Sequence, residues 1–241
     1  MRQSYVVHDF SRAGPTSSGA RKFTISTDHS TVPLGSGKGI YPKWGKRLFD
    51  IAMAVMLLPL VLPLMAVLFM LVALDGGRPV FSHSRVGKDG RIFHCYKVRT
   101  MVLNAEERLE EILKNDPAAA KEWAEDFKLR NDPRITRIGR FLRKTSLDEL
   151  PQLWNVLRGD MSLVGPRPVT EPEIQLYGRD AGAYCSVSPG VTGIWQVSGR
   201  NSLSFDERVA LDNYYATHLS LREDLRILFM TVPAVLHATG F

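Results

Sequence analysis

The feature that most constrains the fold of this chain is an uncharged apolar segment at residues 51–74. It runs for 24 residues between Asp50 and Asp75. A straight helix of that length would measure about 36 Å, which is enough to cross the hydrocarbon core of a bilayer. The rest of the sequence contains no second segment of this kind, so a polytopic membrane protein is excluded.

Two prolines and the flanking charges decide how such a segment can meet a bilayer. Pro59 and Pro63 each lack an N–H, and their rings clash with the preceding helical turn, so the sequence predicts a bend near the middle. Basic residues lie on both sides of the segment, and the positive-inside rule favours such flanks on the cytoplasmic side; they are Lys43, Lys46, Arg47, Arg78, Arg85, Lys88 and Arg91. A re-entrant helix satisfies this rule, while a simple span and a buried core helix remain as alternatives.

Composition narrows the class of protein. With 44% hydrophobic and 23% charged residues, the chain is not disordered as a whole. Its net charge of +6 predicts an anionic partner. A nucleic-acid binder has no use for the apolar segment, so nucleic acid is not the expected partner. The two cysteines cannot form a disulfide framework and fit a reducing compartment.

The remaining sequence predicts a mixed, helix-rich α/β fold with short strands and amphipathic helices. Residues 1–42 are rich in Ser, Thr and Gly and are expected to form a flexible tail. Residues 80–83 and 92–97 are expected to form a strand hairpin around the turn 88–90. Expected helices cover residues 105–114 and 117–129, one opened by 131–133, one containing Leu150 to Leu157, and two late ones announced by Ser204…Glu207 and Ser220…Glu223.

The helix opened by residues 131–133 combines an apolar side with arginines at positions 134, 137, 140 and 143. One interpretation is a solvated basic face. The other is a helix lying in the membrane interface, with its apolar side in lipid and its arginines on phosphates.

Two adjacent carboxylates, Asp148 and Glu149, lie in the run 143–151 (RKTSLDELP). One interpretation is structural, because Ser146 and Glu149 have the spacing of a capping box. Pro151 argues against that box and favours Asp148 as the cap, since proline is tolerated only where no N–H is needed. The other interpretation is chemical, because paired carboxylates beside Arg143 suit a hard divalent cation or a phosphoryl nucleophile.

Four further runs accompany this one in order along the chain: residues 46–50 (KRLFD), 96–101 (YKVRTM), 159–168 (GDMSLVGPRP) and 189–201 (PGVTGIWQVSGRN). The set closely resembles the bacterial sugar transferase family, the monotopic phosphoglycosyl transferases that begin exopolysaccharide, O-antigen or glycoprotein glycan assembly. The resemblance extends from residue 43 to the C-terminus. Within the family, the chain is most similar to the galactosyl- or glucosyl-phosphate transferases that initiate exopolysaccharide synthesis.

The resemblance implies a membrane topology and a domain layout. Residues 43–78 would form a re-entrant helix–break–helix in the cytoplasmic leaflet of the bacterial inner membrane, and residues 79–241 a catalytic domain facing the cytoplasm. The family often has a Ser-Pro pair at the break, where this chain has Leu62 and Pro63. No room is left for a Rossmann domain, so loops must form the nucleotide site.

The resemblance also implies a reaction. A sugar 1-phosphate, galactose or glucose, passes from a UDP-sugar to undecaprenyl phosphate, and UMP is released. Asp148 matches the family's nucleophile and would form a covalent aspartyl-phosphosugar intermediate. Glu149 completes the dyad by holding Mg²⁺ or by positioning the acceptor phosphate. Both substrates are anions, and Mg²⁺ on these carboxylates would supply the charge neutralisation that the attack requires.

Further positions are expected to bind phosphate or nucleotide: Lys97, Arg99, Arg143, Gly165, Pro166, Arg167, Pro168, Arg200 and Asp212. Several of them have a plain structural alternative. Lys97 could be an exposed ladder residue, Arg200 part of a surface salt bridge and Asp212 an exposed helix acid. The loop 165–168 could be a simple turn.

Two alternatives to this enzyme remain. One is a catalytically silent membrane scaffold that recruits polysaccharide enzymes, and the other is direct transfer without a covalent intermediate. The sequence leaves open the sugar, the oligomeric state, the role of the tail and the polysaccharide pathway.

Overall fold

The computed structural model describes residues 5–7, 23–25, 40–126, 129, 131–199 and 203–236. Most of the expected tail and Arg200 therefore lie outside the described residues. Within the tail, β1 (Tyr5–Val7) and β2 (Phe23–Ile25) pair antiparallel. The remaining elements are η1 (Tyr41–Gly45), α1 (Lys46–Ala73), β3 (Val80–Val86), η2 (Lys88–Gly90), β4 (Ile92–Val98), α2 (Ala105–Asn115), α3 (Pro117–Asp126), α4 (Arg137–Thr145), η3 (Leu147–Glu149), α5 (Gln152–Arg158), β5 (Ser162–Val164), α6 (Glu171–Leu176), η4 (Gly178–Asp180), α7 (Ala181–Cys185), β6 (Gly190–Thr192), α8 (Ile194–Ser198), α9 (Phe205–Thr217) and α10 (Leu221–Leu236).

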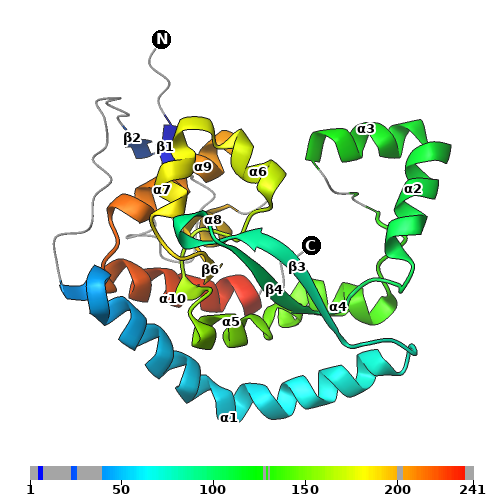
Figure 1. Ribbon diagram of the computed structural model, residues 1–241, viewed down its shortest axis with the longest axis horizontal. Helices are drawn as coiled ribbons and strands as arrows, with labels where there is room; N and C mark the ends of the chain where they lie inside the picture. The colour runs from blue at the N-terminus through cyan, green and yellow to red at the C-terminus, as the bar shows by residue number, and fades with distance from the viewer. Residues whose placement is uncertain are drawn as a thin grey trace, which may run out of the picture.

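The apolar segment forms the long helix α1, which lies along one edge of the molecule (Figure 1). Pro59 and Pro63 lie inside it, and its axis changes direction near the middle, as the two prolines predict. The helix is nevertheless assigned without interruption from Lys46 to Ala73, so the expected helix–break–helix is one continuous bent helix.

Only a narrow stripe of α1 packs against the rest of the protein. The buried apolar residues of this stripe lie seven or four residues apart, which is about two helical turns or one turn; they are Ala54, Val61, Leu68 and Val72. Other faces are bare: Leu60 is 72% exposed. By length and composition α1 together with η1 could cross a membrane, and 17% of the apolar window is buried in the protein. That small share excludes the buried core helix.

Charged residues at the start of α1 attach it to the domain. The ammonium of Lys46 lies 3.1 Å from Asp50 Oδ1 and 2.8 Å from Asp224 Oδ2 at the start of α10. Asp50 Oδ1 in turn accepts a hydrogen bond from the N–H of Leu163 in β5. Arg47 donates to the carbonyl oxygens of Val156 and Leu157 at the end of α5. The motif at residues 46–50 therefore attaches the start of α1 to α5, β5 and α10.

The expected hairpin is confirmed and is longer than predicted. β3 and β4 pair antiparallel, with Phe81 opposite Lys97 and Val86 opposite Ile92. The tight turn between them requires a left-handed backbone at Asp89 (φ 57°) and Gly90 (φ 71°), two residue types that adopt it readily.

The helices that the sequence predicts are present, but some of them begin or end at other residues than predicted. Asp116 Oδ1 accepts from the N–H groups of Ala118 and Ala119, so α3 begins as predicted, but Leu129 is not helical. α4 begins at Arg137, later than predicted, because Thr136 caps it through the N–H of Gly139. Asp132 instead binds the guanidinium of the buried Arg134.

The core lies between α1, the hairpin and the C-terminal helices. β5 and β6 form a short parallel pair in its middle, with Ser162 opposite Gly190. Side chains from α5, α8, α9 and α10 surround this pair, among them Val156, Trp195, Tyr215 and Ile227. α2 and α3 stand apart from this body as a helical arm (Figure 1).

A close backbone contact at Gly139 yields a stability prediction. A Cβ there would lie 2.0 Å from the carbonyl oxygen of Thr100, and backbone borders the contact on both sides. We expect Gly139→Ala to lower the free energy of unfolding by about 2 kcal/mol, the typical cost of overpacking. Thermal unfolding in detergent measures this as a fall of roughly 4–8 °C in Tm. Gly182→Ala, at an exposed glycine of α7, is the control and should not lower Tm. An unchanged Tm in Gly139→Ala would show that the contact relaxes.

Candidate functional site

The two adjacent carboxylates lie on η3, a single 3-10 turn between α4 and α5. Ser146 ends α4 in the left-handed conformation (φ 57°), and its N–H donates to the carbonyl oxygens of Leu142 and Arg143. The capping box from Ser146 is therefore absent. Asp148 is not a helix cap either, because α5 starts only after Pro151, which is its N-cap residue. The sharp turn presents the carboxylates of Asp148 and Glu149 side by side.

Lys97 of β4 lies against this pair. Its ammonium is 2.7 Å from Glu149 Oε1 and 3.9 Å from Asp148 Oδ2. The lysine is thus partly covered and paired, and the alternative of an exposed ladder residue is wrong. A strand of the hairpin and a turn 50 residues later along the chain meet here, so β4 positions the cation that the carboxylates need.

Burial sets the acid–base behaviour of the pair. Asp148 is only 7% exposed. Desolvation raises the pKa of its carboxyl above the usual range, and the negative charge of Glu149 adds to the rise. The positive charges of Lys97 and Arg143 oppose it. The two cations therefore offset part of the effect of burial on the pKa of Asp148.

Arginines from three elements approach the same place. Arg143 of α4 donates from Nε to the Thr100 hydroxyl at 2.9 Å. Its burial lowers the pKa of its guanidinium, and the positive charges of Arg134 and Arg167 act in the same direction. Within the described part of the chain, neither Arg143 nor Arg167 forms an ion pair with a carboxylate. Cations without acidic partners, gathered beside a carboxylate pair, form a surface for a polyanion.

The loop 165–168 is held rigidly beside these arginines. A Cβ at Gly165 would lie 2.4 Å from the carbonyl oxygen of Ser188, so only glycine allows this approach to the β6 side. The N–H of Gly190 donates to Pro166 O at 2.7 Å, and Arg85 donates to Pro168 O at 3.2 Å.

Two of the sequence-predicted site residues have structural partners. The guanidinium of Arg99 donates to the carbonyl oxygens of Val72 (2.9 Å) and Arg78 (3.0 Å) and lies 3.7 Å from Asp75. It therefore caps the end of α1. Asp212 is fully buried in α9 and accepts from the Tyr177 hydroxyl at 2.9 Å. It is not an exposed helix acid. Arg200 lies outside the described residues.

The carboxylate pair has the chemistry for a magnesium ion that shares its ligands with a substrate. Mg²⁺ takes oxygen ligands, commonly one or two carboxylates with phosphates and water completing the shell. Asp148 and Glu149 offer two carboxylates, and among the described residues no three His, Cys, Asp or Glu side chains come together as a metal site. The donor set therefore fits an ion held jointly by protein and phosphate.

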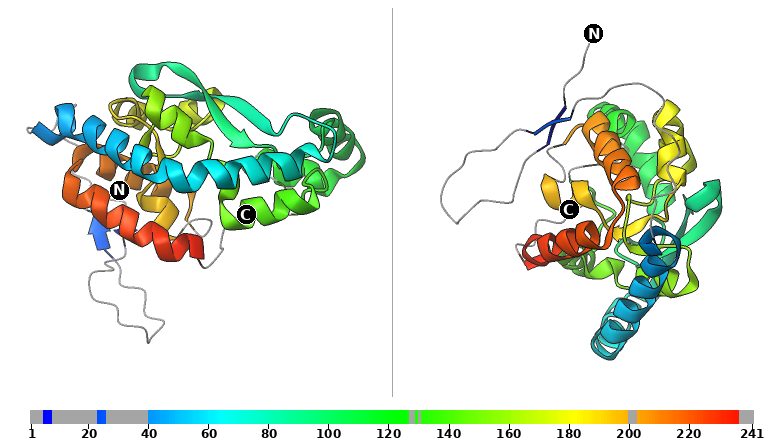
Figure 2. Two further views of the ribbon diagram at one scale, coloured as in Figure 1. Left: turned by 90° about the horizontal axis from the view of Figure 1, so that it is seen from below. Right: turned by 90° about the vertical axis from the view of Figure 1, so that its left-hand side faces the viewer.

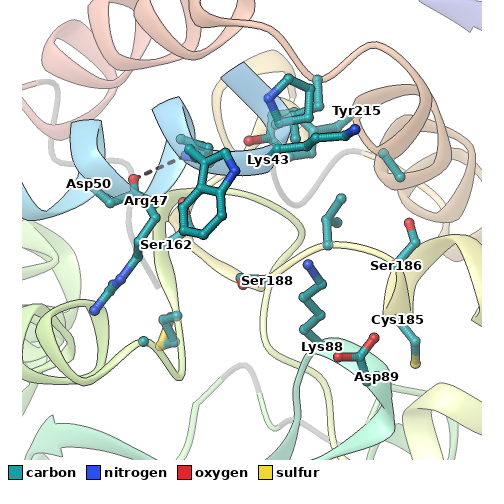
Figure 3. Close-up of a pocket in the computed structure, with 18 of the residues that line it drawn as sticks. Lys43, Arg47, Asp50, Lys88, Asp89, Ser162, Cys185, Ser186, Ser188 and Tyr215 are labelled. Carbon is teal, nitrogen blue, oxygen red and sulfur yellow. Dashed lines mark hydrogen bonds and ion pairs between the residues drawn. The ribbon is translucent and has the colours of Figure 1, made fainter. Parts of the chain in front are cut away.

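A cavity of about 870 Å³ lies elsewhere, at the start of α1 (Figure 3). Lys43, Arg47, Lys88 and Ser188 are among the residues that line it, and neither carboxylate of the pair belongs to its walls. The cavity lies between the docked start of α1 and the domain.

Sequence reasoning missed several residues that build the site. Tyr184, fully buried in α7, touches the loop 165–168 through its hydroxyl. Asn155 of α5 joins that helix to β4, through Tyr96 N–H and His94 O. The sequence could have indicated the role of Asn155, because an asparagine among the apolar residues of α5 needs hydrogen-bond partners when it is buried. Thr170 and Glu173 form a capping box with the same spacing as the confirmed box of Ser204 and Glu207.

The buried acid Asp212 leads to a prediction on stability against pH. Its pKa is raised to about 8 by burial, against a value of about 3.9 in the unfolded chain. Between these values the folded protein binds the extra proton, so stability falls as pH rises from about 4 to about 8. We expect Asp212→Asn to remove this fall and to exceed the wild-type Tm at pH 8.5, measured by thermal unfolding across pH 5–9. Asp206→Asn, at an exposed position on the same helix, should retain the wild-type pH dependence. Equal slopes in all three proteins would contradict a raised pKa.

Known proteins share this sequence over most of its length. The family model described as bacterial sugar transferase matches residues 41–238. The UDP-galactose-lipid carrier transferase of Erwinia amylovora is 56% identical over 195 residues, which cover 81% of this chain and 41% of that protein. The undecaprenyl-phosphate galactose phosphotransferase of Salmonella typhimurium is 53% identical over the same shares. The exopolysaccharide production protein ExoY of Rhizobium meliloti is 45% identical over 227 residues, 93% of this chain and 97% of that protein.

The chain thus spans about two fifths of the length of the first two relatives and nearly all of the third. The matched region contains α1, the hairpin, the carboxylate pair and the loop 165–168. Because the family model matches most of its residues and these relatives are far above 30% identity, the chain belongs to the bacterial sugar transferase family.

Proposed function

We propose that this protein transfers a sugar 1-phosphate, of galactose or glucose, from a UDP-sugar to undecaprenyl phosphate as the first membrane step of exopolysaccharide assembly. The observation that carries the proposal is the buried Asp148 beside Glu149, with Lys97 bridging the pair and Arg143 next to it. The names of the Salmonella and Rhizobium relatives support the acceptor and the pathway class.

The proposed transfer proceeds in two displacement steps at the same phosphorus. An Asp148 carboxylate oxygen attacks the sugar-side phosphorus of the donor diphosphate, and the bond from that phosphorus to the bridging oxygen breaks. UMP leaves with the electron pair, and a covalent aspartyl-phosphosugar remains. An oxygen of undecaprenyl phosphate then attacks the same phosphorus, the Asp148–phosphorus bond breaks, and the diphosphate-linked sugar lipid is released.

Different residues around Asp148 neutralise the charges of the carboxylates and of the substrate phosphates. Lys97 holds Glu149 and lowers the proton affinity of Asp148, which opposes the effect of burial and favours the ionised form of the attacking oxygen. Arg143 and Arg167 bind phosphate oxygens, for which the guanidinium fork is suited. Asp148 and Glu149 would hold Mg²⁺, and a bound ion would supply further charge neutralisation at the substrate phosphates.

The membrane arrangement follows from α1. Its exposed faces are apolar, it is bent near Pro59 and Pro63, and both of its flanks are basic. We infer that α1 enters the bacterial inner membrane from the cytoplasmic side and returns to it, which leaves the carboxylate pair in the cytoplasm beside the membrane surface. The acceptor headgroup lies at that surface, so the site can meet a soluble nucleotide and a lipid at once.

The test is UMP release by the purified protein in detergent, with Mg²⁺ and undecaprenyl phosphate, across a panel of UDP-sugars. We expect release from one hexose donor, dependent on both the lipid and the metal. Well-folded protein that releases no UMP from any donor would overturn the proposal and favour the membrane scaffold.

Removing the nucleophile gives a specific prediction. Asp148→Asn keeps the shape of the side chain but cannot form the phosphoaspartyl bond, so we expect turnover to fall at least about 10³-fold with little change in Tm. Mass spectrometry should find a phosphohexose adduct on Asp148 in wild-type protein treated with donor alone. Asp89→Asn, at the hairpin turn, is the matched control and should keep wild-type turnover. Activity retained in Asp148→Asn would remove this residue from the nucleophile role.

The charge of Lys97 gives a prediction on pH. Its positive charge lowers the pKa of Asp148, so Lys97→Gln leaves only Arg143 to oppose the effect of burial and raises that pKa further. Since Asp148 must be ionised to attack, the acidic limb of the kcat/KM profile should move to higher pH. The control is Lys88→Gln at the exposed turn of the same hairpin, which should leave the limb in place. An unshifted limb in Lys97→Gln would mean that another group sets it.

A further inference from the structure

A single buried hydroxyl joins the hairpin to the loop beside the carboxylates. Tyr184 is 0% exposed, and its hydroxyl lies 2.9 Å from Val86 O and 3.2 Å from Arg167 O. The same oxygen accepts a hydrogen bond from the N–H of Val169 at 3.2 Å. One phenol group thus contacts the end of β3 and both sides of Pro168.

Three further main-chain carbonyls of this loop accept hydrogen bonds. Pro166 O accepts from the N–H of Gly190, Pro168 O from Arg85, and Val169 O from the N–H of Val86 at 2.9 Å. Arg167 carries the one N–H of the Pro-Arg-Pro sequence, because proline has none. Among the residues that the structure describes, that N–H donates to no acceptor. A loop fixed by these bonds that leaves a main-chain donor unused is prepared for a ligand oxygen.

The side chain of Arg167 indicates the charge of that ligand. Its guanidinium lies over the ring of Trp195, 5.8 Å from the centroid, and has no carboxylate partner in the described part of the chain. Arg85 and Arg143 lie close enough for mutual repulsion with it. An unused N–H, an unpaired guanidinium and two neighbouring arginines together suit an anion.

We propose that Tyr184 is a positioning residue whose hydroxyl holds the loop 165–169 so that the N–H and guanidinium of Arg167 bind the phosphates of a nucleoside diphosphate donor. This inference rests on the proposed function. It assigns to a buried tyrosine, outside all of the motifs in the sequence, the task of setting the donor site. A loop without this tether would sample other conformations, and donor binding would have to select one of them.

Tyr177 offers a matched control within the same aromatic cluster. It packs edge-on against Tyr184 with ring centroids 5.3 Å apart, and it is also buried. Its hydroxyl, however, donates to Asp212 and does not contact the loop. Tyr177→Phe and Tyr184→Phe therefore each remove a buried hydroxyl, and only the second removes a tether of the loop.

The experiment measures UMP binding by calorimetry and steady-state kinetics on the full chain in detergent. We expect Tyr184→Phe to weaken UMP binding and raise the donor KM by at least about fivefold, the size of one lost hydrogen bond. The acceptor KM should not change. Tyr177→Phe should lower Tm about as much as Tyr184→Phe and leave the donor KM within twofold of wild type.

The outcomes separate this inference from the proposed function. Wild-type protein that neither binds UMP nor releases it would overturn both. Normal turnover with equal donor KM in the two variants would overturn only the role of Tyr184. If Tyr184→Phe does not fold, Arg85→Lys tests the second tether, at Pro168 O, while keeping the charge. A donor KM raised several-fold supports the positioned loop, and an unchanged one overturns it.

Discussion

The arrangement of this protein depends on a buried ionic contact at the start of α1. A helix that leaves most of its apolar surface uncovered cannot be held by burial alone, because only its narrow inner stripe meets the domain. Lys46 lies between Asp50 and Asp224, and the Tyr41 and Tyr215 hydroxyls bind the two oxygens of Asp224. Buried charges are stable only when paired and hydrogen-bonded in this way. The contact therefore fixes the start of α1 beside the start of α10 (Figure 2).

The hydrogen-bond network around Lys46 and Asp224 also connects the start of α1 to the candidate site. Asp50 binds the N–H of Leu163, and Tyr215 lies 2.8 Å from Val164 O, so both ends of the network hold β5. β5 leads directly into Gly165 and the rigid loop that carries Arg167. At its far end, α1 is capped by Arg99, which lies two residues after Lys97 on the same chain segment. The anchor helix and the carboxylate pair are thus connected at two points, through β5 and through β4. The proposed transfer from a soluble donor to a lipid would require such a fixed relation between the lipid surface and Asp148.

Much of the architecture could be predicted from local pattern. The hairpin, the bend at the prolines and the helix starts at Asp116 and Ser204 follow from strand alternation, missing N–H groups and capping side chains, all of which act within a few residues. The predicted helix start at 131–133 and the predicted cap at Asp148 were wrong, the second because α5 starts only after Pro151. The capping box at Ser146, against which Pro151 argues, is absent. Asp132 binds Arg134 instead of capping a helix, and Ser146 serves as the end of α4.

By itself the sequence determined the apolar anchor, the hairpin and the adjacency of Asp148 and Glu149, because those depend on residue type and near-neighbour spacing. Tertiary structure alone decided which cations face that pair. Lys97 reaches it across 52 positions of the chain, whereas Arg99, two residues further on, turns to the end of α1. It also decided that Asp212 is buried beside Tyr177 and that the Tyr184 hydroxyl meets the loop at Arg167. Hydrogen bonds and ion pairs need atoms within about 3–4 Å, and between distant segments only the folded chain sets such distances.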